Sequence, residues 1–302
     1  MKNRKIAGIL MVMISAVLYG LNSVLVKLTT QLGAGVGSVM LIRGCWVVLM
    51  TGLMLFQKKE TVLLPRLLLL EVTVFGIAGG VVTELALTSA YLLLPVGTVT
   101  IIHYLYPVLV NVGGFLLCKK PPQKSTTVVL FIAMLGIIAF FEPGSGISVK
   151  GVIIALVSSF SWTIHLLSLD YTQLRHLSPR QILFFHSCFS IVVGGTICVI
   201  NRETPFQLPL QAIFLLGLSG IICYGLAGMF LTAGIQRVGA GIAAVFGILE
   251  PVSSIAFGLL LKEKITPRQG LASILILIAV LALLIRQLKE TKTENMNQTD
   301  AM

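Results

Sequence analysis

Charged residues are scarce in this chain of 302 residues. They make up 11% of the sequence, hydrophobic residues make up 56%, and the mean hydropathy is +0.99. Because a soluble domain carries about 25% charged residues, this chain has too few to cover a water-facing surface. The scarcity excludes a soluble globular protein and indicates an integral membrane protein, in which most side chains face lipid or other helices.

Catalytic and metal-binding motifs are also missing. The sequence contains no HExxH, nucleophile elbow or P-loop. Its five cysteines have no CxxC spacing, and Cys118 and the others lie within or at the end of apolar runs, so we interpret them as small apolar side chains. We therefore predict no metal, no cofactor and no enzymatic activity. The missing P-loop excludes an ATP-driven pump within this chain.

Acidic residues are few relative to basic ones, with 11 Asp and Glu against 22 Lys and Arg and a net charge of +11. A basic chain can bind nucleic acid, but here the basic residues lie in short loops between apolar runs, as topology signals do. Most of them fall on the side of the N-terminus when the runs are taken as alternating spans. We predict that both termini are cytoplasmic and that nucleic acid is not a partner.

Apolar runs that approach the roughly 20 residues needed to cross a bilayer recur along the chain. Segments that continue a helix poorly separate them, such as Gln57-Lys-Lys-Glu and Pro143-Gly-Ser-Gly. The polar end, residues 289–302, is predicted to be a disordered cytoplasmic tail. The sequence predicts an all-α membrane protein with ten transmembrane helices, at residues 6–28, 35–56, 67–91, 96–118, 126–141, 149–169, 182–200, 210–233, 239–261 and 269–288.

One long segment of the sequence is repeated. Residues 87–124 match residues 231–268 at a constant offset, and the glycine and proline matches carry the most weight because each restricts the backbone for a steric reason. We predict two five-helix repeats, residues 1–142 and 143–288. Because five is odd, the second repeat enters the membrane from the opposite side, which is the inverted duplication of many transporters. The weightiest matches are Gly97 with Gly241, Pro107 with Pro251, and Gly114 with Gly258.

The repeated segments resemble a known family. Leu249-Glu-Pro-Val followed by Leu261-Lys-Glu-Lys-Ile-Thr-Pro, with Leu105-Tyr-Pro-Val as the first-half counterpart, is similar to the EamA-type members of the drug/metabolite transporter superfamily. The chain departs from the family pattern at Lys119, where the loop acid supplied by Glu263 in the second half is missing. The resemblance implies a substrate path between the repeats, lined by the first, third, fourth, sixth, eighth and ninth spans. It implies that the second and seventh spans rock or sit at the side.

Glu250 is the most informative ionisable residue, because charged groups inside a bilayer are costly and persist where they face a cavity or each other. It lies mid-span directly before Pro251, and Pro251 leaves the carbonyl near Gly247 without its usual amide donor. The sequence thus predicts helix breaks at Pro251 and at its counterpart Pro107. Glu250 either faces a cavity, where it binds a cation or a proton, or is bonded to a neighbouring helix.

A second acidic residue, Glu84, lies at a depth similar to that of Arg43 in the second span. The two either form a buried ion pair, or Glu84 faces the cavity while Arg43 attracts an anionic substrate group. His186 takes the place of Arg43 in the second repeat, and we interpret it as structural. Glycines in the third and eighth spans predict close helix packing.

Polar and aromatic residues gather in the first, fourth and sixth spans. His103 and Tyr106 are three residues apart and share a helix face, as do Tyr19 and Asn22. The predicted mid-membrane binding site therefore consists of Tyr19, Asn22, Glu84, His103, Tyr106, Trp162, His165 and Glu250.

These features predict a secondary transporter of the plasma or inner membrane that moves a small polar metabolite, such as an amino acid, by alternating access. By resemblance the direction is export, and proton coupling through Glu250, His103 and Glu84 is a hypothesis. The alternatives are a multidrug exporter, a membrane-embedded enzyme, a lipid scramblase and a passive channel. The expected partners are the bilayer, the substrate and protons. The duplication completes a site in one chain, so a monomer suffices and a dimer is not required.

Overall fold

All regular secondary structure among the residues that the computed structural model describes is helical. Seven helices within the described residues are long and apolar enough to cross a membrane, which makes the chain a multi-pass membrane protein. Two shorter apolar helices cover Tyr106–Leu117 and Ser273–Arg286. The described residues are 2–94, 99, 102–118, 127–128, 130–132, 134–135, 148–260, 267, 270–271, 273–279, 281–282 and 284–286.

Ten spans remain the prediction, because much of the predicted fifth span and parts of the fourth and tenth lie outside the described residues, as does the predicted tail, residues 289–302. The side of the membrane on which the termini lie and the boundaries between the repeats also stay predictions. The other seven predicted spans agree with the seven long helices within a few residues, except that the eighth extends to Val238.

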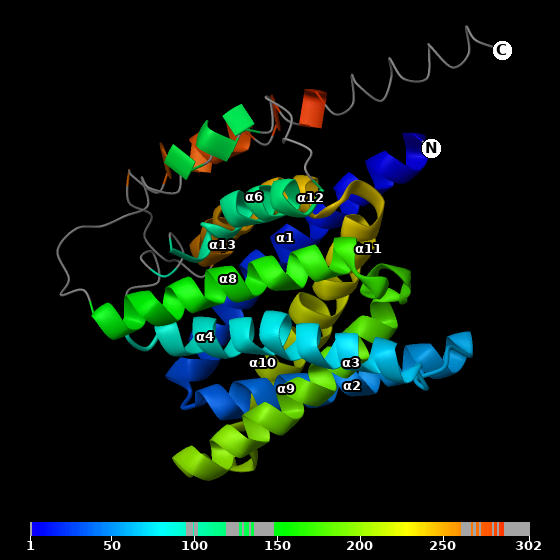
Figure 1. The fold of residues 1–302 in the computed structure, drawn as a ribbon. Helices are drawn as coiled ribbons and strands as arrows, with labels where there is room; N and C mark the ends of the chain where they lie inside the picture. The colour runs from blue at the N-terminus through cyan, green and yellow to red at the C-terminus, as the bar shows by residue number, and fades with distance from the viewer. Residues whose placement is uncertain are drawn as a thin grey trace, which may run out of the picture.

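The described residues of the first half form five α-helical segments and a π-helical one (Figure 1). They are α1 (Lys2–Gln31), α2 (Val36–Lys58), α3 (Arg66–Phe75), η1 (Gly76–Val81), α4 (Val82–Ala90) and α6 (Tyr106–Cys118). The described second half follows the same order. It contains α8 (Val149–Tyr171), η2 (Gln173–His176), α9 (Pro179–Asn201), η3 (Pro205–Gln207), α10 (Leu210–Leu218), η4 (Ser219–Leu226), α11 (Ala227–Val238), α12 (Ala240–Gly247) and α13 (Leu249–Leu260).

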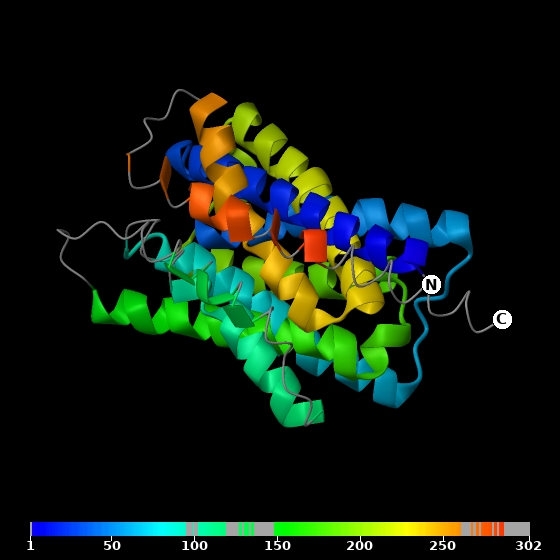
Figure 2. The ribbon, with the colours of Figure 1, turned by 90° about the horizontal axis from the view of Figure 1, so that it is seen from above.

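The two halves interlock rather than lie side by side. The first helix, α1, packs against α11 and α13 of the second half, whereas α8 packs against α4 and α6 of the first (Figure 1, and from above in Figure 2). The close approach of α1 to α13 depends on Gly20, where an added Cβ would meet the backbone of Glu250. Residues far apart in sequence therefore meet at the centre of the molecule.

The extensive α2–α9 contact joins equivalent helices of the two repeats. Small residues line this seam: a Cβ on Gly37 would lie 2.7 Å from the Cys198 amide nitrogen, and one on Gly194 would lie 2.8 Å from the Leu41 amide nitrogen. Because backbone faces backbone at these points, the helices approach closely without bulky side chains between them.

Two π-helical turns occur at equivalent places in the two repeats, η1 in the third span and η4 in the eighth. Both lie in the glycine-rich segments for which the sequence predicts close packing. Gly79 in η1 lies against the backbone of α8, where the Ser161 hydroxyl donates a 3.1 Å hydrogen bond to its carbonyl. The Thr83 hydroxyl donates to the same carbonyl at 2.5 Å. Side-chain hydroxyls thus donate hydrogen bonds to a backbone carbonyl of the irregular turn. In a membrane, where water is absent, the backbone groups of an irregular helix need such partners within the protein.

Two acidic residues hold the ends of the α2–α9 pair. Glu203, just after α9, accepts hydrogen bonds from the Gly37 and Ser38 amides at 3.2 and 2.7 Å and so caps the N-terminus of α2. Glu60, just after α2, pairs with Arg180 and accepts from the Ser178 hydroxyl at 2.5 Å at the start of α9. Because α2 and α9 are antiparallel, one contact lies at each end of the pair.

The carboxylate form of both acids is favoured in the folded protein. Hydrogen bonds from the Arg180 guanidinium lower the pKa of Glu60. Partial burial alone would raise the pKa of Glu203, but hydrogen bonds from the Ser38 hydroxyl and the Ser38 and Gly37 amides outweigh it and lower the pKa.

We expect Glu203→Gln to lower the free energy of unfolding by about 1 kcal/mol at pH 7, because the capping charge is lost. A lowered folded pKa adds stability above the unfolded pKa of about 4.3, and that stability is lost as the pH falls through the folded pKa. The difference between wild type and variant should therefore shrink between pH 5 and about pH 3. Thermal unfolding in detergent at a series of pH values measures it. A difference that stays constant down to pH 3 would contradict the capping role.

Candidate functional site: a polar cavity between the repeats

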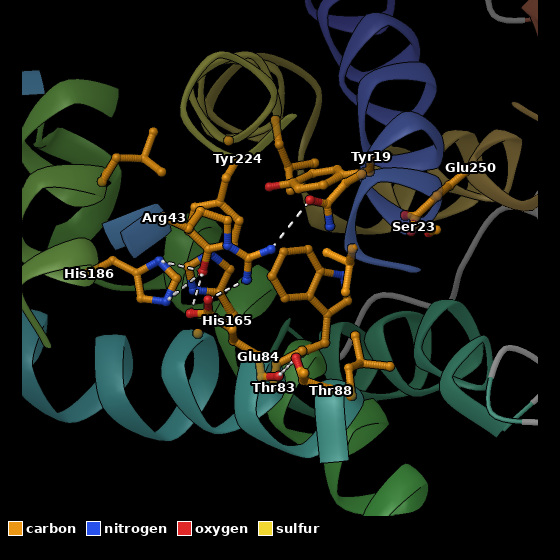
Figure 3. Close-up of a pocket in the computed structure, with 18 of the residues that line it drawn as sticks. Tyr19, Ser23, Arg43, Thr83, Glu84, Thr88, His165, His186, Tyr224 and Glu250 are labelled. Atoms are coloured by element: carbon orange, nitrogen blue, oxygen red, sulfur yellow. Dashed lines mark hydrogen bonds and ion pairs between the residues drawn. The ribbon is translucent and has the colours of Figure 1, made fainter. Parts of the chain in front are cut away.

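A cavity of about 110 Å³ lies where the two halves meet. Ligand pockets commonly measure about 300–1,000 Å³, so in this structure the cavity has room for only a small ligand. Its lining comes from α1, α2, α4, α8, α9, α11, α13 and the two π-helical turns (Figure 3). The polar and aromatic lining residues are Tyr19, Asn22, Ser23, Arg43, Thr83, Glu84, Thr88, Tyr91, His103, Trp162, His165, His186, Tyr224, Thr232 and Glu250.

Arg43 and Glu84 form a buried ion pair at one end of the cavity (Figure 3). The Glu84 carboxylate also accepts hydrogen bonds from the Ser190 hydroxyl at 2.7 Å and the Tyr224 hydroxyl at 3.1 Å. The Arg43 guanidinium carbon lies 4.5 Å from the centroid of the Tyr224 ring, within cation–π range. This confirms the ion-pair alternative, and both residues also line the cavity.

Asn22 links this pair to the first and eighth spans. Its side-chain oxygen accepts from Arg43 Nη1 at 3.3 Å and from the Ser219 hydroxyl at 2.7 Å. One donor therefore comes from α2 and the other from η4. The pair is consequently held by side chains from both repeats, and a change in their relative position would alter its hydrogen bonds.

Aromatic rings form a continuous wall along the cavity. Trp162 is at the centre, in edge-to-face contact with Tyr19 at 6.3 Å and with Tyr106 at 6.5 Å between ring centroids. His165 stacks on Trp162 at 5.0 Å. The His103 ring lies 5.3 Å from that of Tyr106 and its Nδ1 is 3.0 Å from the Ser158 hydroxyl oxygen. Such contacts hold the rings in place without covering the Trp162 side that lines the cavity.

Glu250 lies away from the Arg43–Glu84 pair, with Tyr19 between them in Figure 3. It belongs to the first turn of α13, directly after a break at Ile248 that separates α12 from α13. The equivalent turn at Tyr104 and Leu105 precedes α6, so the chain is interrupted just ahead of both Pro107 and Pro251. Tyr104 approaches the Glu250 carboxyl group. Within the described part of the chain, no Lys, Arg or His nitrogen forms an ion pair with it.

The structure brings the predicted residues together. Tyr19, Asn22, Glu84, His103, Trp162, His165 and Glu250 line one cavity, and Tyr106 packs behind Trp162. Glu250 thus faces a cavity rather than only a neighbouring helix. That these residues bind a substrate stays a prediction.

The sequence interpretation missed several residues that line the cavity, among them His186 and Tyr224. His186, interpreted as structural, lines the cavity with its Nε2 3.3 Å from the Tyr224 hydroxyl oxygen. The available signal was its alignment with Arg43. Tyr224 has no such signal, because it aligns with Gly80 and lies in a glycine-rich segment. The second and seventh spans, placed to the side by the resemblance, supply Arg43 and His186 to the lining, which corrects that expectation.

A helical membrane protein with two interlocked halves and a polar cavity between them has the architecture of a transport protein. The chain belongs to the EamA-like transporter family, which it matches over residues 6–141 and again over residues 149–285. The expectation of an EamA-type member of the drug/metabolite transporter superfamily is confirmed.

Comparison with solved structures supports the fold. One of them, described only as "Crystal structure of protein", has a TM-score of 0.76 and 16% sequence identity over 90% of this chain and 96% of its own. At that identity the likeness shows the fold alone. No curated protein matches the chain.

Proposed function

We propose that the protein is a secondary transporter that exports a small polar metabolite, an amino acid being one candidate, across the plasma or inner membrane by alternating access. The observation that carries this proposal is the cavity, which holds a buried ion pair and a carboxyl group without an ionic partner among the described residues. Polar groups are costly in a membrane interior and persist where a solute path needs them. A non-catalytic role is part of the proposal.

The second part of the proposal is that transport is coupled to protons through Glu250. A carboxyl group that lies in a cavity without a paired cation can hold a proton at one stage of a cycle and release it at another. Among the described residues, the titratable groups that interact electrostatically with it are Tyr19 from α1, Tyr104, and Tyr106 from α6. None of these tyrosines carries a positive charge that would keep Glu250 permanently ionised.

Uptake into proteoliposomes from a mixed metabolite pool tests the proposal. We expect the wild type to accumulate at least one compound, with a rate that depends on an imposed pH gradient. Ser23→Trp should abolish accumulation because the indole fills the cavity that Ser23 lines. The matched control is Leu10→Trp on the same helix, where the side chain is 50% exposed on the outer surface of the helix bundle, and transport should persist.

Each part of the proposal has its own opposing outcome. Accumulation that ignores the pH gradient and survives Glu250→Gln would exclude Glu250 as the coupling residue and leave transport in place. No movement of any compound by correctly folded wild type would overturn the transporter itself, in favour of a scramblase or another membrane-embedded activity. Single-channel currents would indicate a passive channel instead.

A further inference from the structure

The two charged regions of the cavity differ in how far their charges are compensated. At one end, Arg43 and Glu84 neutralise each other, and Glu84 takes further hydrogen bonds from Ser190 and Tyr224. Arg43 is only 4% exposed, and its Nε is buried without a hydrogen-bond partner in the described part of the chain. A ligand anion at this end of the cavity therefore meets an arginine whose charge Glu84 already neutralises.

The other region carries an uncompensated acid. Glu250 lines the cavity, and the described residues place no cationic nitrogen within ion-pair distance of it. Tyr104, whose hydroxyl has no hydrogen-bond partner in the described part of the chain, is neutral and supplies no compensating charge. With Glu250 ionised, the charged side chains of the described residues that line the cavity, Arg43, Glu84 and Glu250, sum to a net negative charge. The cavity therefore attracts a cation and disfavours an anion.

Aromatic faces accompany the uncompensated acid. Tyr19 and Trp162 line the same cavity as Glu250, and their ring centroids lie 6.3 Å apart with the ring planes at a right angle. Tyr106 meets the same indole at 6.5 Å, also at a right angle. Two rings at right angles present surfaces of different orientation, and the face of an aromatic ring attracts an organic cation. A carboxylate near such rings is the chemistry that recognises an ammonium group.

We propose that the substrate carries an organic ammonium group, bound by Glu250 and the Tyr19–Trp162 pair, and needs no carboxylate. The inference rests on the proposed transport function and deepens it by naming the class of substrate. A zwitterion carries the same ammonium group, but Arg43 is already paired with Glu84 and is not free to bind the carboxylate of the zwitterion. Organic cations therefore bind more tightly than zwitterions of the same size, and both bind more tightly than anions.

Three probes of similar shape isolate the charge: choline, its uncharged analogue 3,3-dimethyl-1-butanol, and the zwitterion glycine betaine. Binding is followed as a ligand-induced rise in melting temperature of the purified protein in detergent, independently of transport. We expect choline to stabilise the wild type, glycine betaine to do so only at higher concentration, and the alcohol to have no effect. Equal stabilisation by choline and the alcohol would overturn the inference.

Variants assign the effect to the named residues. Glu250→Gln should weaken choline binding at least about tenfold, the loss expected for one charge-assisted contact. Trp162→Leu should weaken it as well, whereas Trp162→Phe should retain most of it because the aromatic face remains. The matched control is Glu71→Gln, because Glu71 lies outside the cavity and accepts a hydrogen bond from the backbone N–H of Gln173. Unchanged choline binding in folded Glu250→Gln would overturn the assignment.

Uptake by the same preparations separates this inference from the proposed function. Choline binding that needs Glu250, with no transport of any compound, would support the ammonium site and count against the transporter. Transport of metabolites that lack an ammonium group, without choline binding, would support the transporter and overturn the ammonium site.

Discussion

Arg43→Met is expected to lower the free energy of unfolding by about 3–5 kcal/mol, because it leaves the buried Glu84 carboxylate without its cation. Glu84 is 6% exposed, and its remaining partners, Ser190 and Tyr224, are neutral donors. Neutral donors offset only part of the cost of removing a carboxylate from water. The measurement is unfolding by increasing SDS in mixed micelles, followed by tryptophan fluorescence.

A double variant distinguishes loss of the pair from loss of packing. Arg43→Met combined with Glu84→Gln should recover most of the stability, because the amide can still bond Ser190 and Tyr224 while no charge remains buried. The matched control is Arg180→Met, which removes an arginine from the half-buried pair with Glu60 at one end of α9. It should cost about 1 kcal/mol or less. Equal losses in both single variants, with no recovery in the double variant, would contradict the buried-pair account.

Gly79→Val is expected to cost about 3 kcal/mol or more, the upper end for overpacking a core. A Cβ at this position would lie 2.8 Å from the Cα, Cβ and amide nitrogen of His165. Backbone cannot turn away as a flexible side chain can, so α8 has to move relative to η1. Because His165 stacks on Trp162, the same movement should displace the cavity wall and weaken ligand binding.

Gly52→Val provides the matched control within another transmembrane helix. A Cβ on Gly52 would meet only Phe184 Cε2, at 3.6 Å, which is an ordinary contact. This variant should unfold within about 1 kcal/mol of the wild type, because the only remaining effect is the difference in helix preference. The same SDS titration compares the two, and choline binding reports the state of the cavity. A Gly79→Val protein as stable as Gly52→Val would show that η1 and α8 can separate freely.

Which residues form the site was largely predictable because polar residues are rare in an apolar chain. Tyr19, Asn22, Trp162, His165 and Glu250 stand out within apolar spans, and the repeat aligns Tyr19 with Trp162 and Asn22 with His165. A polar side chain in a membrane span must find a partner or a cavity. Composition and spacing alone therefore predicted these residues as candidates for the site, and all five line the cavity in the structure.

How these residues pair was not predictable, because it depends on the rotation of each helix about its own axis. The sequence left open whether Arg43 is paired or free, and only the packing of α2 against its neighbours brings it to Glu84. Tyr224 lies in the π-helical turn η4, where the hydrogen-bond pattern lengthens and the helix face shifts. Regular helical spacing therefore misplaces such a residue.

The sequence by itself determined that this is a helical membrane protein built from two related halves, because composition, run length and repeated glycine and proline positions are local properties of the chain. Only the tertiary structure decided that Glu203 caps a helix 165 residues away, that Arg43 is neutralised, and that Glu250 is left without an ionic partner in the described chain. The physical reason is that charge compensation acts through space between helices. It becomes visible only when their relative positions are known.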